Sequence, residues 1–244
     1  MTNEAYVSAS LEPLFEKELI TDVLHVVKSG KEATVYCCAA HPTTGVELLA
    51  AKVYRPRENR TFKNDALYQH GRMLDKRLQR AISNRSRKGL EVQFSSWIEH
   101  EYSTLHLLYA AGATIPRPIA HSGSAILMEY VGDHTAPAPL LINVTPTRNE
   151  ARRFFDLLMH NIQLWLSCER VHGDLSPYNI LYWQGDIKII DFPQSVHPQN
   201  NPNAFNLLAH DIETVCNYLA RYGVRANPRR ITEDMWVRYQ FREL

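Results

Sequence analysis

The chain has 244 residues, of which 45% are hydrophobic, so it can bury a sizeable core. Its 27 lysines and arginines balance 26 aspartates and glutamates, and bulk charge gives no reason to expect a nucleic-acid binder. No apolar run approaches the roughly 18 residues of a membrane span. The N-terminus lacks a basic and apolar leader, so we expect a cytoplasmic protein without a membrane partner. Four cysteines without C-x-x-C spacing are expected to be reduced.

The first part of the chain predicts a short helix over residues 11–19 and strands within residues 20–54. Between two β-rich stretches lies VKSGKEATVY, residues 27–36, whose small residues would let backbone amides approach a phosphate. Gly30 is its only glycine, so it matches neither common glycine-rich phosphate motif. An ordinary β-turn is the competing interpretation of this loop.

A single lysine stands in the apolar run LLAAKVY, residues 48–54. Burying an unpaired ammonium group is costly, so Lys52 needs an anionic partner unless it snorkels from an edge strand. Residues 91–111 repeat apolar side chains at helical spacing, and Glu101 falls on the apolar face whereas Glu99 points away. We therefore predict a Lys52–Glu101 pair.

Between these elements lies a basic segment over residues 72–88. It holds seven cations against the single acid Asp75. A solvated helix and loop is the simpler interpretation, and an anionic partner such as RNA or an acidic protein is the alternative. No aromatic residue is interleaved among the cations, which argues against base stacking.

The middle of the chain predicts further strands over residues 115–131, which end in LMEYVG. Thr147 and Glu150 have the spacing of a capping box that opens a helix. The apolar stripe of that helix comprises Phe154, Leu157, Leu158, Ile162 and Trp165. Two later helices are expected, over residues 203–222 and after Thr232.

Residues 171–192, VHGDLSPYNILYWQGDIKIIDF, carry the strongest chemical signal. Residues 180–183 and 187–190 read as strands joined at residues 184–186, where Gly185 favours a tight hairpin. Such a hairpin folds Asp191 back beside Asn179. His172 is expected to support the loop rather than act as a base.

Phosphoryl transfer needs divalent cations on the phosphates and a carboxylate that orients and deprotonates the nucleophile. Asp174 can accept the proton, and Asn179 and Asp191 offer the hard oxygen ligands that Mg²⁺ prefers. Any one of these residues alone would more often cap a helix or shape a turn. Their combination with the hairpin favours a phosphotransferase.

The motifs SGKEATVY, AAKVY, WIEHEYSTLHLL, LMEYVG, HGDLSPYNIL and IIDFPQSV follow one another over residues 28–196. In this order they resemble the RIO family of atypical serine/threonine protein kinases, in the subgroup without an N-terminal winged helix. The resemblance implies an α+β, two-lobed, protein-kinase-like fold without a long activation segment. Its β-rich N-lobe would comprise residues 1–131, with the phosphate loop and helix C, and its reduced helical C-lobe residues 132–244. Only 53 residues follow Asp191, which agrees with a reduced C-lobe.

The resemblance assigns Asp174 as the catalytic aspartate, and Asn179 and Asp191 as ligands of Mg²⁺, with Mn²⁺ as an alternative. It also implies that Asp191 could accept phosphate itself, in an ATPase cycle. Lys52 would contact the phosphates, and the backbones of Glu129 and Val131 the adenine edge. The ATP-contacting residues would be Ser29, Gly30, Lys31, Val35, Lys52, Glu101, Met128, Glu129, Val131, Leu181 and Ile190. Gly173 and Pro193 depart from ordinary kinases and put control by activation-loop phosphorylation in doubt.

The function expected from these features is an ATP- and Mg²⁺-dependent serine protein kinase, with the three polar residues converging on the nucleotide between the lobes. Its substrate would be another protein or the chain itself, at Ser83 or Ser86. The basic segment is a flexible loop beside the ATP site in relatives, and a ribosomal or RNA-containing particle would be its partner. A small-molecule kinase of the aminoglycoside or choline type shares the H-G-D-x-x-x-x-N loop but usually needs a larger C-lobe. An ATP-sensing binding module without turnover is the other alternative.

Overall fold

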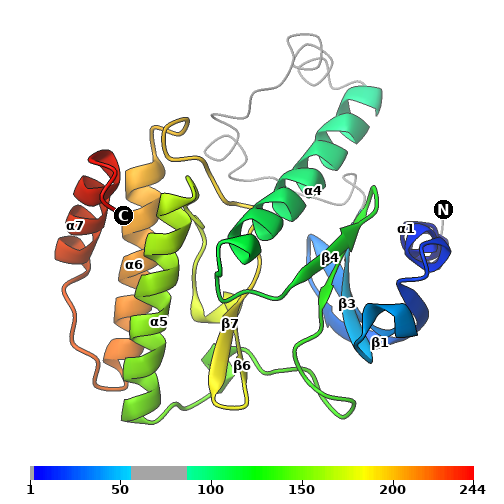
Figure 1. Ribbon diagram of the computed structural model, residues 1–244, viewed down its shortest axis with the longest axis horizontal. Helices are drawn as coiled ribbons and strands as arrows, with labels where there is room; N and C mark the ends of the chain where they lie inside the picture. The colour runs from blue at the N-terminus through cyan, green and yellow to red at the C-terminus, as the bar shows by residue number, and fades with distance from the viewer. Residues whose placement is uncertain (1–2, 56–86) are drawn as a thin grey trace. The chain divides into compact units, whose positions relative to one another are not determined.

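The computed structural model describes the backbone of residues 3–55 and 87–244, and the side chains of residues 5–55 and 94–244 (Figure 1). Ser83, Ser86 and most of the basic segment lie outside the described residues. The chain divides into two compact units. Of the described residues, 3–55, 87–103 and 116–137 belong to unit 1, and 104–115 and 138–244 belong to unit 2. No helix in the described ranges is long and apolar enough to cross a membrane.

Unit 1 is built on an antiparallel five-stranded sheet with the order β1-β2-β3-β5-β4. The strands are β1 (Ile20–Ser29), β2 (Ala33–Ala40), β3 (Leu48–Tyr54), β4 (Pro118–His121) and β5 (Ala125–Glu129), and a short 3₁₀ turn, η1 (Pro42–Thr44), precedes β3. Side chains alternate between the two faces of a strand. On one face, the buried side chains Leu49, Ala51 and Val53 of β3 pack in one core with Leu11 and Leu14.

The helix that covers this face, α1 (Asn3–Glu16), begins eight residues before the expected start at residue 11. The expectation placed Pro13 in the first turn, where proline is best tolerated. Instead, Pro13 lies inside the helix, and the earlier turns are held by tertiary contacts. Tyr6 and Val7 pack against the sheet core, and the Tyr6 hydroxyl donates to the Tyr54 carbonyl at 2.9 Å.

The helix α4 (Arg87–Ala110) contributes to both units. Residues 104–115 precede the expected boundary at residue 131, yet they group with unit 2. The reason is hydrogen bonding to other residues of unit 2: Thr104 accepts from Arg170 at 3.4 Å, and the Thr114 amide donates to the Asn161 side chain at 2.7 Å. The end of α4 and the loop after it therefore belong to the packing of unit 2.

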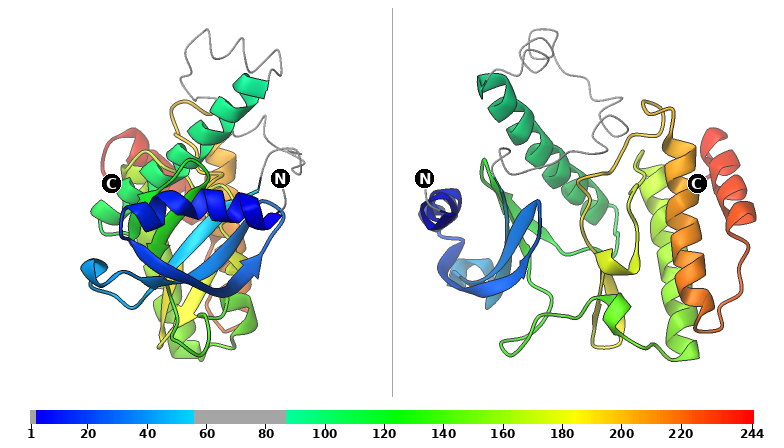
Figure 2. Two further views of the ribbon diagram at one scale, coloured as in Figure 1. Left: turned by 90° about the vertical axis from the view of Figure 1, so that its right-hand side faces the viewer. Right: turned by 180° about the vertical axis from the view of Figure 1, so that it is seen from behind.

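Unit 2 consists of a helical layer and a β-hairpin. Its helices α5 (Arg148–Ser167), α6 (Ala204–Ala220) and α7 (Pro228–Gln240) lie side by side in Figures 1 and 2. The hairpin strands are β6 (Ile180–Trp183) and β7 (Asp186–Ile189), and two short 3₁₀ turns are η3 (Leu141–Asn143) and η4 (Pro177–Asn179). The predicted capping box is confirmed, since Thr147 and Glu150 bond each other reciprocally at the start of α5.

Two further element boundaries, both in unit 2, differ from expectation. The hairpin turn contains only Gln184 and Gly185, both with positive φ (50° and 83°), so Asp186 already belongs to the strand. This is the two-residue turn whose twist suits a hairpin. The last helix begins at Pro228 rather than after Thr232, because Asn227 caps it and proline is tolerated at its first position.

Candidate active site

The predicted Lys52–Glu101 ion pair is present in unit 1, with Nζ 2.8 Å from Oε1. Glu101 is almost fully buried, at 1% exposed, while Lys52 keeps 13% of its side chain exposed. The Tyr54 hydroxyl donates a short hydrogen bond to the other carboxylate oxygen, and its ring lies 5.1 Å from the Lys52 ammonium. A buried carboxylate is tolerated only when both oxygens have partners. Strand β3 supplies both partners from one face, two residues apart.

An apolar patch lies on the same face of the sheet as Lys52. Ala50 and Cys37 are buried there, with Val35 and Met128 partly exposed beside them. The strand register pairs Val35 with Lys52 and Ala50 with Met128. Val35 and Met128, both predicted to contact ATP, thus flank a cation on one surface of unit 1. An apolar surface beside a positive charge suits a base and its phosphates.

The predicted adenine-edge segment begins at Glu129, the last residue of β5. The Glu129 amide donates to the Arg117 carbonyl at 2.8 Å, and the Glu129 carboxylate accepts from the Arg117 amide at 3.0 Å. These two bonds fix the backbone of Glu129. Val131, two residues later, is buried.

The predicted phosphate loop forms the tight turn between β1 and β2. The Gly30 amide donates to the Ala33 carbonyl at 2.8 Å, and Ser29 pairs with Thr34 across the strands. The Ser29 hydroxyl accepts from the Arg55 guanidinium at 2.8 Å. Lys31 is exposed at the tip of the turn. The β-turn interpretation therefore describes the local geometry, and a phosphate role for these residues stays a prediction.

In unit 2, the loop of Asp174 is locked by hydrogen bonds to its own backbone. The Asn179 side-chain amide donates to the Asp174 carbonyl at 2.7 Å, while the Asp174 carboxylate side chain is exposed. The nitrogen of Asn179 is thereby directed to the loop, and its oxygen is the atom left for the predicted metal contact. This orientation is what the predicted role of Asn179 requires.

The hairpin brings Asp191 back to this loop. The Ile190 amide donates to the Asn179 carbonyl at 2.9 Å, and β6 pairs with β7 from Ile180 to Ile189. Leu181 and Ile190, two predicted ATP contacts, are both half-buried on this hairpin. Asp191 has φ of 74°, a left-handed conformation that costs energy in a residue other than glycine. Such strain is concentrated at functional sites.

His172 links the two loops and is 1% exposed. Its Nδ1 accepts from the Asp174 amide and its Nε2 donates to the Ile190 carbonyl, both at 3.3 Å. The ring also packs against Phe192 and Trp165, with centroid distances of 4.5 and 5.7 Å. These contacts confirm the expectation that His172 supports the loop.

A functional residue that the sequence argument did not assign is Asp211 on α6. Its two carboxylate oxygens accept from the amides of Gly173 and Leu175, each at 2.8 Å. Burial raises the pKa of this carboxyl to about 7, although the two amides act to lower it. Gly173, whose amide is the first of these two donors, has φ of 82°. Asp211 therefore holds the backbone on both sides of Asp174.

The donor set fits a hard cation. Asn179 and Asp191 offer an amide oxygen and a carboxylate, the ligands typical of Mg²⁺ sites that phosphate oxygens and waters complete. Within the described ranges, no group of three or more histidines, cysteines, aspartates or glutamates is arranged to hold a metal alone.

Comparison with known proteins decides the family. A family model for the RIO domain matches residues 34–231, most of the chain. The chain belongs to the RIO family. It is 32% identical to the serine/threonine-protein kinase RIO1 of Chaetomium thermophilum, over 86% of this chain and 42% of that protein. It is also 32% identical to the RIO-type serine/threonine-protein kinase Rio1 of Methanocaldococcus jannaschii, over 92% of this chain and 73% of that protein. The RIO chain thus spans less than half the length of its eukaryotic relatives.

The solved structures confirm the expected kinase-like fold for this RIO chain. A Rio2 kinase from Chaetomium thermophilum, solved as an ADP/Mg²⁺-phosphoaspartate complex, matches with a TM-score of 0.69 at 21% identity. The match covers 96% of this chain and 66% of that one. The α+β class, with a β-rich N-terminal part and a helical C-terminal part, is therefore confirmed.

Two supporting residues of the RIO site had signals that the sequence argument did not use. Asp211 is the one acid among the buried residues of α6, next to Ile212 and one turn from Leu208 and Val215. A carboxylate on such a face needs buried partners. Tyr54 stands two residues after Lys52, so both side chains face the same side of β3. Because side chains alternate along the strand, Tyr54 is expected beside Glu101, the predicted partner of Lys52.

The Lys52–Glu101 pair gives a first prediction. Lys52→Met leaves the Glu101 carboxylate buried without its cation and should lower the free energy of unfolding by about 3 to 5 kcal/mol. The double variant Lys52→Met/Glu101→Leu should recover at least about 2 kcal/mol of this loss, because no buried charge remains. Urea denaturation followed by circular dichroism measures both values. A double variant no more stable than the single one would contradict the pairing.

The raised pKa of Asp211 gives a second prediction. The folded chain holds this proton more tightly than the unfolded chain, so the contribution is complete below pH of about 4 and is lost as pH rises through about 7. Between pH 5 and 8 this loss should amount to about 2 to 3 kcal/mol. Asp211→Asn should remove that part of the pH dependence in urea denaturation. Asp234→Asn, an exposed control on α7, should keep it, and equal slopes in both variants would refute the assignment.

Proposed function

We propose that this RIO domain is an ATP- and Mg²⁺-dependent phosphotransferase that acts on serine hydroxyls of proteins. One observation carries the proposal: Asp174, Asn179 and Asp191 are held in a single hydrogen-bonded arrangement of loop and hairpin. The Asn179 side chain bonds the Asp174 backbone, and the residue before Asp191 bonds the Asn179 backbone. Kinase names among the relatives support the same activity.

Asp174 is the group that would orient the substrate hydroxyl and take its proton. Its carboxylate is exposed, while its amide bonds His172 and its carbonyl accepts from Asn179. The backbone is thus fixed on both sides, and the acid can meet a hydroxyl without reorganising the loop. Pre-organised positioning of this kind is the main protein contribution to phosphoryl transfer.

The remaining residues would hold the nucleotide. Lys52, fixed by Glu101, would contact the phosphates, and Val35 and Met128 would contact the base. The Glu129 carbonyl and the Val131 amide would bond the adenine edge. Mg²⁺ bound by Asn179 and Asp191 would neutralise the charge of the phosphates.

A hydrolytic cycle is the second candidate, and two observations favour it. Asp191 has a left-handed backbone beside Asn179, and the related Rio2 kinase was solved with ADP, Mg²⁺ and a phosphoaspartate. In such a cycle the γ-phosphorus forms a bond to an Asp191 oxygen as its bond to the ADP oxygen breaks. Water then hydrolyses the acyl phosphate and releases inorganic phosphate.

Partners and location are proposed from the sequence. The cations of residues 72–88 would bind an RNA-containing particle, because clustered cations release counterions from phosphates. RNA binding that does not weaken with added salt would contradict this mode. All four cysteines are unpaired, which suits the reducing cytoplasm that we propose as the location.

The activity is tested with γ-labelled ATP and Mg²⁺. We expect label on the chain or on an added protein, and about a hundredfold or greater loss in Asp174→Asn, because general-base groups contribute about 10² to 10⁴ in rate. Asp186→Asn, which removes an exposed carboxylate from the neighbouring hairpin, is the matched control and should change the rate less than about twofold. Full turnover in Asp174→Asn would exclude the catalytic assignment.

The chemistry of the label separates the alternatives. Acid-stable label indicates phosphoserine, and label released by hydroxylamine indicates Asp191. Transfer only to small alcohols such as choline or aminoglycosides would indicate a small-molecule kinase. ATP binding without turnover in the unaltered chain would indicate a nucleotide-sensing module.

A further inference from the structure

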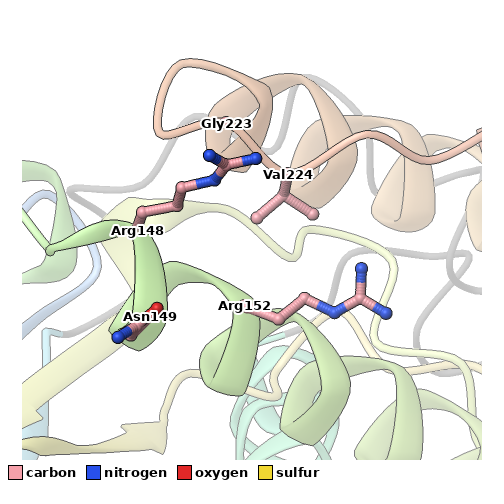
Figure 3. A pocket seen from close by; sticks show the side chains of 5 residues that line it. All are labelled: Arg148, Asn149, Arg152, Gly223 and Val224. Atoms are coloured by element: carbon pink, nitrogen blue, oxygen red, sulfur yellow. The ribbon is translucent and has the colours of Figure 1, made fainter.

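A cavity of about 260 Å³ opens in unit 2 between the start of α5 and the loop after α6. Figure 3 shows its lining residues, Arg148, Asn149, Arg152, Gly223 and Val224. None of them belongs to the candidate active site. Arg148 and Arg152 are four residues apart on one side of α5. In Figure 3 the Arg148 guanidinium lies beside Gly223, and Arg152 extends from the next turn of the helix with its guanidinium apart from that of Arg148. Val224 is 4% exposed and forms an apolar wall.

The absence of a side chain at Gly223 leaves room for the Arg148 side chain. It has φ of 87°, a conformation that side chains rarely adopt. A Cβ added there would lie 3.4 Å from Arg148 Nε and 3.6 Å from its Cδ. The arginine therefore lies along bare backbone, and any larger residue at position 223 would press on it.

The two arginines are not neutralised in equal measure. Arg152 forms a 3.4 Å pair with Asp156, but both side chains are more than half exposed, and such pairs contribute little. Among the residues that the structure describes, no carboxylate pairs with Arg148. The Glu150 carboxylate, the nearest acid in sequence, is engaged by the Thr147 cap and by Tyr182.

The two sequence stretches that contribute the lining residues are rich in arginine although the whole protein is nearly neutral. Residues 134–153 contain Glu150 as their one acid, and residues 214–232 contain none. The cations of these two stretches, apart from histidines, are Arg148, Arg152, Arg153, Arg221, Arg225, Arg229 and Arg230. All seven are arginines, the residue suited to bidentate contacts with oxyanions.

We propose that this cavity is a second anion site, which binds a phosphate group, free or as a phosphomonoester. Two guanidinium forks on one helix face match phosphate oxygens bidentately, which a point charge such as lysine does not. The volume is several times the roughly 30 Å³ of a water molecule, so it holds a phosphate with a small substituent. The apolar wall at Val224 would contact that substituent.

Isothermal titration with inorganic phosphate and with O-phosphoserine tests the site. The variant Arg148→Gln/Arg152→Gln should weaken binding of both probes by about tenfold or more, because it removes charge-assisted hydrogen bonds. The control Lys17→Gln/Arg242→Gln lowers the net charge equally at exposed positions elsewhere and should bind like the unaltered chain. Phosphate bound at other sites contributes equally to all variants.

A charge-preserving variant separates recognition from general attraction. Arg148→Lys/Arg152→Lys keeps both charges but loses the forks, and we expect binding about three- to fivefold weaker than in the unaltered chain. If the glutamine variant does not fold, this lysine variant still tests the proposal. Tighter binding of phosphoserine than of phosphate would identify a phosphate ester as the ligand. Equal binding of the two probes would identify free phosphate. The proposal is overturned if the unaltered chain binds neither probe, or if both arginine variants bind like the control.

Discussion

One buried carboxylate, Asp211, fixes the loop on which the chemistry of unit 2 rests. Its two oxygens accept the amides of Gly173 and Leu175, which flank Asp174. A carboxylate this deep in an apolar core is tolerated only because both oxygens are bonded. The loop thereby gains a fixed backbone and can present Asp174 to solvent. His172 extends the same restraint to the hairpin that carries Asp191.

Unit 1 follows the same rule: a buried carboxylate positions a more exposed group, which here is a cation. Glu101 is buried and bonded on both oxygens by Lys52 and Tyr54. The partly exposed ammonium is then held beside the apolar patch of Val35 and Met128. In each unit a buried acid serves as the anchor and a more exposed group would do the chemistry. Stability and function therefore depend on the same contacts, and loss of either anchor should impair both.

Much of this could be predicted from the sequence because its signals are local. The capping box at Thr147, the hairpin at Gly185 and the Lys52–Glu101 pair each follow from spacing and from the cost of burying charge. The predicted start of α1 at residue 11 was wrong, because the packing of Tyr6 against the sheet stabilises the helix on the N-terminal side of Pro13. The apolar face of α6 shows that Asp211 needs buried partners, but those partners and the second wall of the Arg148 cavity lie far away in the sequence, and no local pattern identifies them.

We expect Asn179 and Asp191 together to bind a metal that accompanies the nucleotide. Nuclear magnetic resonance with Mn²⁺ and a nonhydrolysable ATP analogue examines this, because a paramagnetic ion broadens nearby amide signals. The amides of Ile180 and Ile190, adjacent in sequence to the two ligands, should lose intensity, and Asp191→Ala should restore it. Undiminished Ile180 and Ile190 signals with the nucleotide bound would contradict the account.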